Sequence, residues 1–182
     1  VEPASVPRMA FKLPVKPSIA VLPFTNMSGD KEQEYFADGI AEDIITDLSK
    51  NAGLFVIARN STFVYKGKAT DVMQVGRELG VRYIVEGSVR KAGNRVRITV
   101  QLIDATDGHH LWAERYDREL EDVFAVQDEI TQVIVANLPR RVEAAHLEQS
   151  KQKPTENMAA YDYVLRAKDH HHKHTKEDNA KA

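Results

Sequence analysis

The chain has 182 residues, of which 42% are hydrophobic and 29% are charged, and its formal net charge is −2. This composition is typical of a globular protein with one well-buried domain and a smaller appendage. The charge excludes a general attraction to nucleic acid or to an acidic membrane surface, and no apolar run approaches the roughly 20 residues that cross a bilayer. The sequence has no cysteine, which excludes disulfides, thiolate metal sites and a cysteine nucleophile and fits a reducing cytoplasm.

Both ends of the chain have the features of a piece taken from a longer protein. The chain begins with Val1, without a secretory signal, and it stops at Ala182 inside a segment that we expect to be helical. Residues 1–17 contain several prolines, which disfavour helix and remove backbone donors, so this segment is predicted to be an extended linker. We expect an α/β domain over residues 18–150.

The sequence pattern in the first part of this domain predicts a parallel pair of strands. Ile19–Phe24 is a continuous apolar run, as expected of a strand that is covered on both faces. A helix from about Glu32 to Lys50 follows, with Gly53 placed to end it in the left-handed conformation, and Leu54–Ala58 reads as the second strand. Strand, helix and strand with short joints indicate a right-handed crossover. The predicted inward face of the helix consists of Phe36, Ala37, Ile40, Ala41, Ile44, Ile45 and Leu48.

A second, shorter helix is predicted over residues 72–79. Thr70 or Asp71 can cap its first turn, and Gly80 can end it. After Gly80 the pattern changes to alternation, which predicts strands over Val81–Arg90 and Arg95–Asp104.

These two strands are predicted to form a hairpin. If Ala92-Gly93 is a two-residue turn, Val89 faces Val96, Val85 faces Val100 and Tyr83 faces Leu102, all on one side.

Asp107-Gly108 predicts a second hairpin, which would pair Leu102 with Ala113 and, on the opposite face, Ile103 with Trp112. Apolar pairs on both faces indicate helices on both sides of the sheet.

The chain after the hairpins is predicted to be helical. Asp122 can cap a long helix, and Pro139 is expected to kink or restart it. Residues 151–182 are predicted to open a helical repeat array, with Thr175 as a further cap. The long helix is expected to bury Phe124, Ile130, Val133, Ile134 and Leu138, and the repeat to bury Tyr161, Val164 and Leu165.

Three acidic residues share one face of the first helix. Glu34, Asp38 and Glu42 are spaced at i, i+4 and i+8, with no lysine or arginine four residues away, so they repel each other mildly. One interpretation is a surface that docks a basic partner or a divalent cation. The other is a solvated face whose acids favour the helix N-terminus.

The loop before this helix is a candidate anion site. Asn26, Ser28 and Gly29 lie where free backbone N–H groups attract anions. The loop lacks the Gly-x-x-x-x-Gly-Lys-Ser/Thr pattern, and Asp30 and Glu32 would repel a phosphate. The alternative is a loop that caps the helix.

Basic residues gather around the first hairpin, where they would form a platform for single-stranded nucleic acid or protect the strands from edge pairing. Because the alternation sends Tyr83 to the apolar face, away from the arginines, protection is the favoured interpretation and no nucleic-acid partner is expected. The residues are Arg82, Arg90, Lys91, Arg95 and Arg97.

Histidines offer a weak metal signal and no sign of catalysis. His170 and His174 share a helical face at i and i+4, which is the spacing of a zinc pair, but a third ligand is not evident. Solvent-facing histidines with adventitious metal uptake are the alternative. Neither a Gly-x-Ser-x-Gly nor a His-Glu-x-x-His motif is present, so no catalytic residue and no cofactor are predicted for this piece.

Three stretches resemble the TolB-like domain of bacterial signalling proteins that carry class III adenylate or guanylate cyclase domains. They are "IAVLPFTNMSGDKEQEYFADGIAEDIITDLSK", "LFVIARNSTFVYKGKATDVMQVGRELGVRYIVEGSVRKAGNRVRITVQLIDATDGHHLWAERYDREL" and "VFAVQDEIT", between about Pro17 and Leu138. "AYDYVLRAKDHHHKHTKEDNAKA" is similar to the start of a tetratricopeptide repeat region.

The resemblance implies a three-layer α/β/α sandwich on a mixed sheet, similar to the N-terminal domain of TolB and to anticodon-binding domains. It also implies a cytoplasmic, non-catalytic domain for signal transduction, which links an upstream cyclase domain to protein-binding repeats. Any Mg²⁺ or Mn²⁺ would serve the cyclase domain, and a homodimer is compatible with this arrangement. The alternative is a receiver domain in a winged-helix transcriptional regulator with tetratricopeptide repeats.

Overall fold

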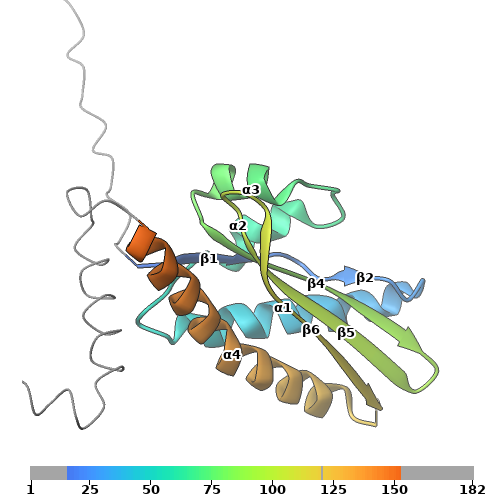
Figure 1. Ribbon diagram of the computed structural model, residues 1–182. Helices are drawn as coiled ribbons and strands as arrows, with labels where there is room; N and C mark the ends of the chain where they lie inside the picture. The colour runs from blue at the N-terminus through green and yellow to red at the C-terminus, as the bar shows by residue number, and fades with distance from the viewer. Residues whose placement is uncertain (1–15, 120, 153–182) are drawn as a thin grey trace, which may run out of the picture.

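The computed structural model describes residues 16–119 and 121–152, which form one six-stranded mixed sheet with helices packed against it (Figure 1). The strand order is β3-β1-β4-β5-β6, and β2 pairs with β4 beside this path. The predicted α/β class with a mixed sheet is therefore confirmed. The strands are β1 (Ser18–Val21), β2 (Thr25–Asn26), β3 (Phe55–Val56), β4 (Tyr83–Ala92), β5 (Arg95–Asp104) and β6 (His109–Glu119). The helices are η1 (Lys31–Gln33), α1 (Glu34–Ser49), α2 (Arg59–Thr62), η2 (Phe63–Tyr65), α3 (Val72–Leu79) and α4 (Val123–Gln152).

Strand β1 lies in the middle of the parallel part of the sheet. It pairs in parallel with β3 on one side and with β4 on the other, so Ile19 lies opposite both Val56 and Tyr83. Its side chains alternate between two apolar clusters: Ile19 and Val21 enter one, and Ala20 enters the other. The prediction that this strand is covered on both faces is confirmed.

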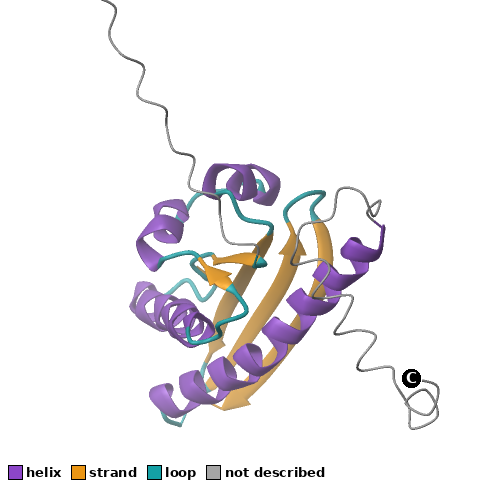
Figure 2. Ribbon diagram, turned by 90° about the vertical axis from the view of Figure 1, so that its left-hand side faces the viewer, coloured by secondary structure: helices purple, strands orange, loops and turns teal. Residues whose placement is uncertain are grey.

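The two clusters lie on opposite faces of the sheet. The first core is formed by the sheet with α1 and α4, which also contact each other, and the second core is smaller and is formed with α3. Figure 2 shows helices on both sides of the strands. The second core contains the buried residues Ala20, Leu22, Val75, Val81, Ile84 and Ala105.

Helix α1 buries the predicted face but ends differently. All seven of the apolar residues expected on its inward face are buried. The helix ends at Ser49, and its cap residue Lys50 keeps a right-handed conformation with its N–H directed to the carbonyl groups of Asp47 and Leu48. Gly53 is not among the glycines with positive φ, so the prediction that it ends the helix in the left-handed conformation is wrong. Its N–H instead donates to the side chain of Asn51 at 2.8 Å.

Helix α3 begins and ends as predicted. The carboxylate of Asp71 accepts a hydrogen bond from the N–H of Met73 at 3.0 Å, which satisfies one of the free donors of the first turn. Gly80 follows the helix with φ of 66° in the left-handed region, which a residue without Cβ adopts at little cost.

The first hairpin has a different register from the predicted one. The turn is Gly93-Asn94, because Ala92 pairs with Arg95, and Val85 therefore lies opposite Leu102. The predicted turn at Ala92-Gly93 is wrong by one residue, and the predicted partner of each residue is therefore wrong by two. Because side chains alternate with a period of two, the apolar residues still share the face of the first core.

The second hairpin is also shifted. Leu102 pairs with Trp112 rather than Ala113, Ile103 pairs with His110, and a bulge separates the two pairs. The loop spans residues 105–108, because Asp104 pairs with His109. The loop is therefore two residues longer than the predicted turn, and the extra residue of the bulge offsets one residue of this shift for the pairs beyond it.

Helix α4 crosses the face of the sheet that holds the first core. Asp122 caps it by accepting hydrogen bonds from the N–H groups of Phe124 and Ala125, as expected. Phe124 is 73% exposed, so the prediction that it is buried is wrong, and Val133 is only partly buried. The helix continues through Pro139 as a single element and does not restart there. Its buried apolar residues are Val126, Ile130, Ile134, Leu138 and Val142.

The described chain enters β1 and leaves α4 at the same end of the molecule (Figure 1). Among the described residues, no helix is both long enough and apolar enough to cross a membrane.

Candidate functional site

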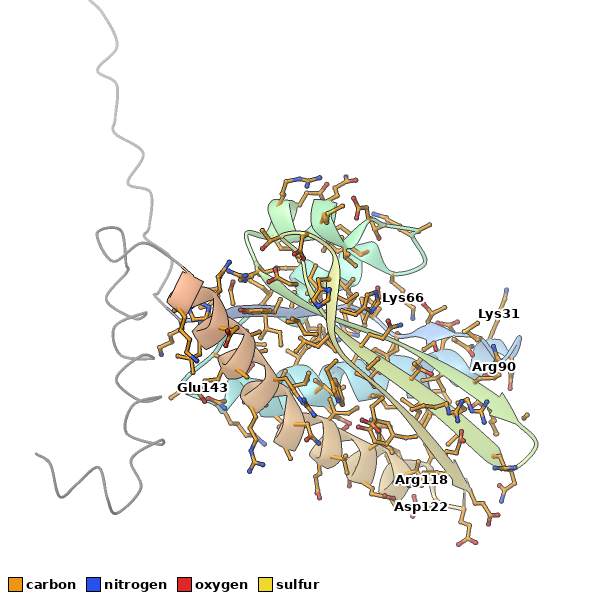
Figure 3. The ribbon with its side chains drawn as sticks, in the orientation of Figure 1. Lys31, Lys66, Arg90, Arg118, Asp122 and Glu143 are labelled. Atoms are coloured by element: carbon orange, nitrogen blue, oxygen red, sulfur yellow. The ribbon has the colours of Figure 1, made fainter. Side chains whose placement is uncertain are left out.

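The acidic face of α1 is held by basic residues from the segment that follows β3. The Nζ atom of Lys66 lies 3.3 Å from the Oε2 atom of Glu34 and also pairs with Asp38. The Nε atom of Arg59 lies 2.9 Å from the Oε2 atom of Glu42. All three predicted residues therefore take part in internal ion pairs, which join α1 to α2 and to the residue after η2. Lys66 is labelled in Figure 3.

The electrostatics of this contact favour the charged state of the lysine. The hydrogen bond to Asp38 is the main reason why the pKa of Lys66 is raised above its usual value, and Glu34 adds to it. The guanidinium of Arg59 also stacks on the ring of Phe63, 3.8 Å from its centroid, which is a cation–π contact. Neither interpretation from the sequence included these partners, because no element was predicted between Ala58 and the helix that begins at Val72.

The other acids of α1 are also engaged. Gln127 of α4 donates a hydrogen bond to Asp43, and Lys50 pairs with Asp47. Asp128 lines a shallow hollow together with these two acids. No group of three or more potential metal ligands is found in the described ranges.

The side chains of the predicted anion loop bond to one another and to neighbouring elements, and none of them caps α1, whose N-cap residue Gln33 has no side-chain capping hydrogen bond. The amide of Asn26 donates to the carbonyl of Asp30 at 2.7 Å and to Glu34 at 3.2 Å, and its oxygen accepts from the N–H of Ser28. The hydroxyl of Ser28 accepts from the N–H of Lys91 on β4 at 2.8 Å. Gly29 has φ of 74°. The polar side chains of the loop therefore tie it to itself, to α1 and to β4.

The basic residues of the first hairpin do not form one platform. Arg82 forms a two-pronged contact with Asp104, with Nη2 at 2.6 Å from the carboxylate, and Arg97 pairs with Asp117. Burial alone would raise the pKa of Asp104, but hydrogen bonds from Thr106 and Arg82 outweigh it and hold this pKa below its usual value. Arg90 and Arg95 are exposed near the turn, at the opposite end of the strand from Arg82.

A hollow of about 490 Å³ opens at the carboxyl end of β1, the place where ligands bind in many open α/β sheets. The side chains of Glu86, Ser88 and Gln101 face it from β4 and β5 and show no polar partner among the described residues. No local sequence pattern predicts this hollow, because its walls come from four separate segments of the chain. They consist of Leu22, Pro23, Thr25, Met27, Tyr65, Gly67, Lys68, Ala69, Thr70, Glu86, Gly87, Ser88 and Gln101.

The histidines do not assemble a site in the described part. His109 and His110 are exposed at the start of β6. His170 and His174, like the predicted repeat helices, lie outside the described residues.

A sequence model of the family described as "HilA/YgeH-like transcriptional regulator, second domain" matches residues 15–133. A curated relative is "Putative adenylate cyclase 3" of Rhizobium meliloti (strain 1021), which is 63% identical over 157 residues. That match covers 86% of this chain but 27% of the relative, so the chain spans about a quarter of the relative's length.

Similar solved structures include the lipoprotein GNA1162 from Neisseria meningitidis, with a TM-score of 0.48 and 20% identity over 66% of this chain and 96% of that one. TolB from Acinetobacter baumannii matches with a TM-score of 0.45 and 16% identity over 67% of this chain and 28% of that one.

Proposed function

The chain belongs to the family of the second domain of HilA/YgeH-like transcriptional regulators, and from this membership we propose that it is a non-catalytic regulatory and interaction domain of a signalling protein. The observation that supports this function most is the course of the chain. It enters at β1 and leaves at the end of α4 on the same end of the molecule (Figure 1), so segments attached to the two ends would lie close enough to influence each other.

The charged groups support the same proposal. The ion pairs of Lys66 and Arg59 join α1 to α2 and to the residue after η2, and Gln127 joins α4 to α1. Such contacts link the helices that cover the sheet to one another. A rigid domain can transmit a displacement of one attached segment to the other.

We propose that the parent protein is an adenylate cyclase that makes cyclic AMP, because the curated relative carries a cyclase name. In this proposal an upstream catalytic domain binds Mg²⁺ or Mn²⁺, residues 18–150 form a three-layer α/β/α domain in the cytoplasm, and residues 151–182 open a protein-binding tetratricopeptide array. A partner that docks on the array would shift α4 and thereby change the geometry of the upstream domain.

Gly39 offers a test of this coupling. A Cβ atom at this position of α1 would lie 2.6 Å from the amide nitrogen of Gln127 on α4. Because Gln127 is flexible, alanine could be accommodated, whereas Gly39→Leu should push α4 away from α1. In the full-length parent, Gly39→Leu should change cyclase output and its response to a repeat-binding partner, and Gly53→Ala in the exposed turn after α1 serves as the control.

Two results would contradict the proposal. The first is an unchanged output in Gly39→Leu, provided that circular dichroism shows a folded domain and hydrogen exchange shows that α4 has been displaced. The second is synthesis of cyclic AMP by the isolated 182-residue chain supplied with ATP and Mn²⁺, since this would place catalysis inside the domain.

The family match favours a second candidate function. In this alternative the same domain is the receiver of a transcriptional regulator, with a winged-helix domain upstream in place of a cyclase. The complete coding sequence of the parent distinguishes the two proposals, since it would show either a class III cyclase domain or a winged helix ahead of Val1.

A further inference from the structure

Strand β6 forms one edge of the sheet and has no strand on its outer side among the described residues. It spans 11 residues, His109–Glu119, whereas β3 at the opposite edge spans only two. A long edge strand presents a row of backbone N–H and C=O groups that are free to pair with another chain. The edge at β3 is too short to do so.

Two common protections against edge pairing are missing from the part of β6 that follows its bulge at Leu111. The strand contains no proline, and its pairing with β5 is regular from Trp112 to Glu119, without a bulge. Natural sheets use such devices, or charged side chains, to prevent association at an exposed edge. The charges of β6 therefore determine which strand it can accept.

The charges of β6 are arranged so that the strand is complementary to a second, antiparallel copy of itself. The segment Glu114-Arg115-Tyr116-Asp117-Arg118 alternates in sign around the central tyrosine. When a second copy runs antiparallel with the two tyrosines opposite each other, Glu114 meets the Arg118 of the second copy. In the same register Arg115 meets the Asp117 of the second copy, and the two-fold symmetry repeats both pairs.

This register is the favourable one in the segment. A two-fold axis at Glu114, Arg115, Asp117 or Arg118 would place that charged residue against its own copy, and like charges directly opposite each other are destabilising. Only the axis at Tyr116 places an uncharged side chain at the centre and opposite charges on both sides of it.

The complementarity holds on both faces of the sheet. Tyr116 contributes to the first core, so Glu114 and Arg118, two residues away on either side, lie on the face that carries α4. Arg118 confirms this orientation, because its Nη2 atom lies 2.7 Å from Glu129 of α4. Arg115 and Asp117 lie on the opposite face, where Asp117 also pairs with Arg97 of β5.

We propose that two copies of this chain associate through their β6 strands, antiparallel around a two-fold axis at Tyr116, so that the two sheets form one continuous sheet. The occupant of the edge is thus a second copy, and the interface is isologous, as in most two-fold homodimers. In a longer parent protein this pairing would bring two upstream domains together, because both copies share the same orientation relative to the axis.

The first experiment measures association of the unmodified 182-residue chain. Sedimentation velocity over a range of micromolar concentrations should show a reversible monomer–dimer equilibrium. Hydrogen exchange should show that the outward-facing amides of β6 become protected as the concentration rises. A chain that stays monomeric throughout, or a dimer that leaves the exchange of β6 unchanged, would overturn the proposal.

Charge variants then test the register. Glu114 forms no ion pair within the described part of the chain, so Glu114→Arg should leave the fold intact while it sets arginine against Arg118 of the second copy. Its dimer dissociation constant should rise at least tenfold. Asp128→Arg, which makes the same change of charge on the exposed surface of α4, is the matched control and should have little effect.

Mixing two variants gives the sharpest test. The second variant combines Arg118→Glu with Glu129→Arg, which keeps the internal pair between β6 and α4 but leaves two acids at positions 114 and 118. Each variant alone should dimerise at least tenfold more weakly than the unmodified chain, and the two mixed should form a heterodimer. Failure of the mixture to associate, while the unmodified chain dimerises, would show that the interface or register is wrong.

Discussion

Gly87 shows how strictly packing can determine a single residue. A Cβ atom at this position of β4 would lie 2.6 Å from the ring of Phe24 and 2.6 Å from the carbonyl oxygen of Thr99. Phe24 is buried in the first core, and the carbonyl belongs to the neighbouring strand, so neither can move away easily. The absence of a side chain at Gly87 thus allows the phenylalanine to lie over β4.

Gly87→Ala should therefore lower the free energy of unfolding by about 1–3 kcal/mol, the usual cost of an overpacked core. Urea unfolding followed by circular dichroism would measure this. Gly53→Ala is the control: the position is exposed, its φ is not positive, and a Cβ there would meet only the side chain of Asn51 at 3.1 Å, so its effect should stay within about 0.5 kcal/mol. Equal effects of the two substitutions would contradict the packing argument.

The contact between Arg82 and Asp104 predicts a dependence of stability on pH. The pKa of Asp104 is lower in the folded protein than its usual value, so the carboxylate stabilises the fold above the pKa of the unfolded chain. This contribution is lost as the pH falls through the lowered pKa of the folded state.

Asp104→Asn should cost about 1–3 kcal/mol at neutral pH, because Arg82 loses its charged partner. The difference between the unmodified protein and the variant should shrink as the pH is lowered below about 4, where the carboxylate of the unfolded chain becomes protonated. Denaturant unfolding at pH 7 and at acidic pH would show this. A difference that stays constant with pH would mean that the carboxylate contributes through packing and not through charge.

For the helices and strands, the sequence predicted the residues that cap helices more accurately than the residues that form ion pairs with α1. Asp71, Gly80 and Asp122 mark helix ends by local chemistry, and the structure confirms all three. The partners of the acidic face were missed because Arg59 and Lys66 reach it only after the chain has crossed from β1 to β3. Nothing in the local spacing of Glu34 and Asp38 indicates them.

The same limit explains the hairpin registers. The alternation of apolar residues fixes which side chains share a face, but it is unchanged by a shift of two residues. The Gly93-Asn94 turn and the bulge beside Ile103 decide the actual pairs, and both depend on backbone geometry. Phe124 was expected to be buried because it is apolar, but it lies in the first turn of α4 and is exposed.

A substitution of Lys66 tests whether its ion pairs with the acidic face of α1 stabilise the fold. Lys66→Gln leaves Glu34 and Asp38 without their cation, so the free energy of unfolding should fall by up to about 1 kcal/mol at low ionic strength. The loss should shrink in high salt, since the side chain is partly exposed and salt screens the pair. The control is Lys68→Gln, because Lys68 forms no ion pair in the described ranges. Equal losses in both variants would show that the pair has no specific role.

At the scale of the whole molecule, the first core joins the parallel and antiparallel parts of the sheet. It includes Ile19 from β1, Leu102 from β5 and Ile134 from α4, which lie far apart in the sequence. The α/β class and the mixed sheet could be predicted because each part has its own periodicity. That both parts share one core could not be predicted, because it depends on packing between residues far apart in the sequence.

This shared core predicts cooperative unfolding. Trp112 is the only tryptophan in the sequence and is buried in the first core, so its fluorescence reports on the antiparallel part, whereas far-ultraviolet circular dichroism is dominated by the helices. The two signals should change at the same urea concentration, as in a two-state transition. Separate midpoints would show that the two parts unfold independently.

The described chain enters and leaves the fold at neighbouring positions, and this affects how the domain can be joined to other domains. The polypeptide enters β1 and leaves α4 on one side of the molecule (Figure 1). The body of the domain therefore projects to the side of the line between the segments that precede and follow it. Inserting it between two neighbours does not push them apart by the width of the domain. The fold therefore suits insertion between two modules that remain close to each other.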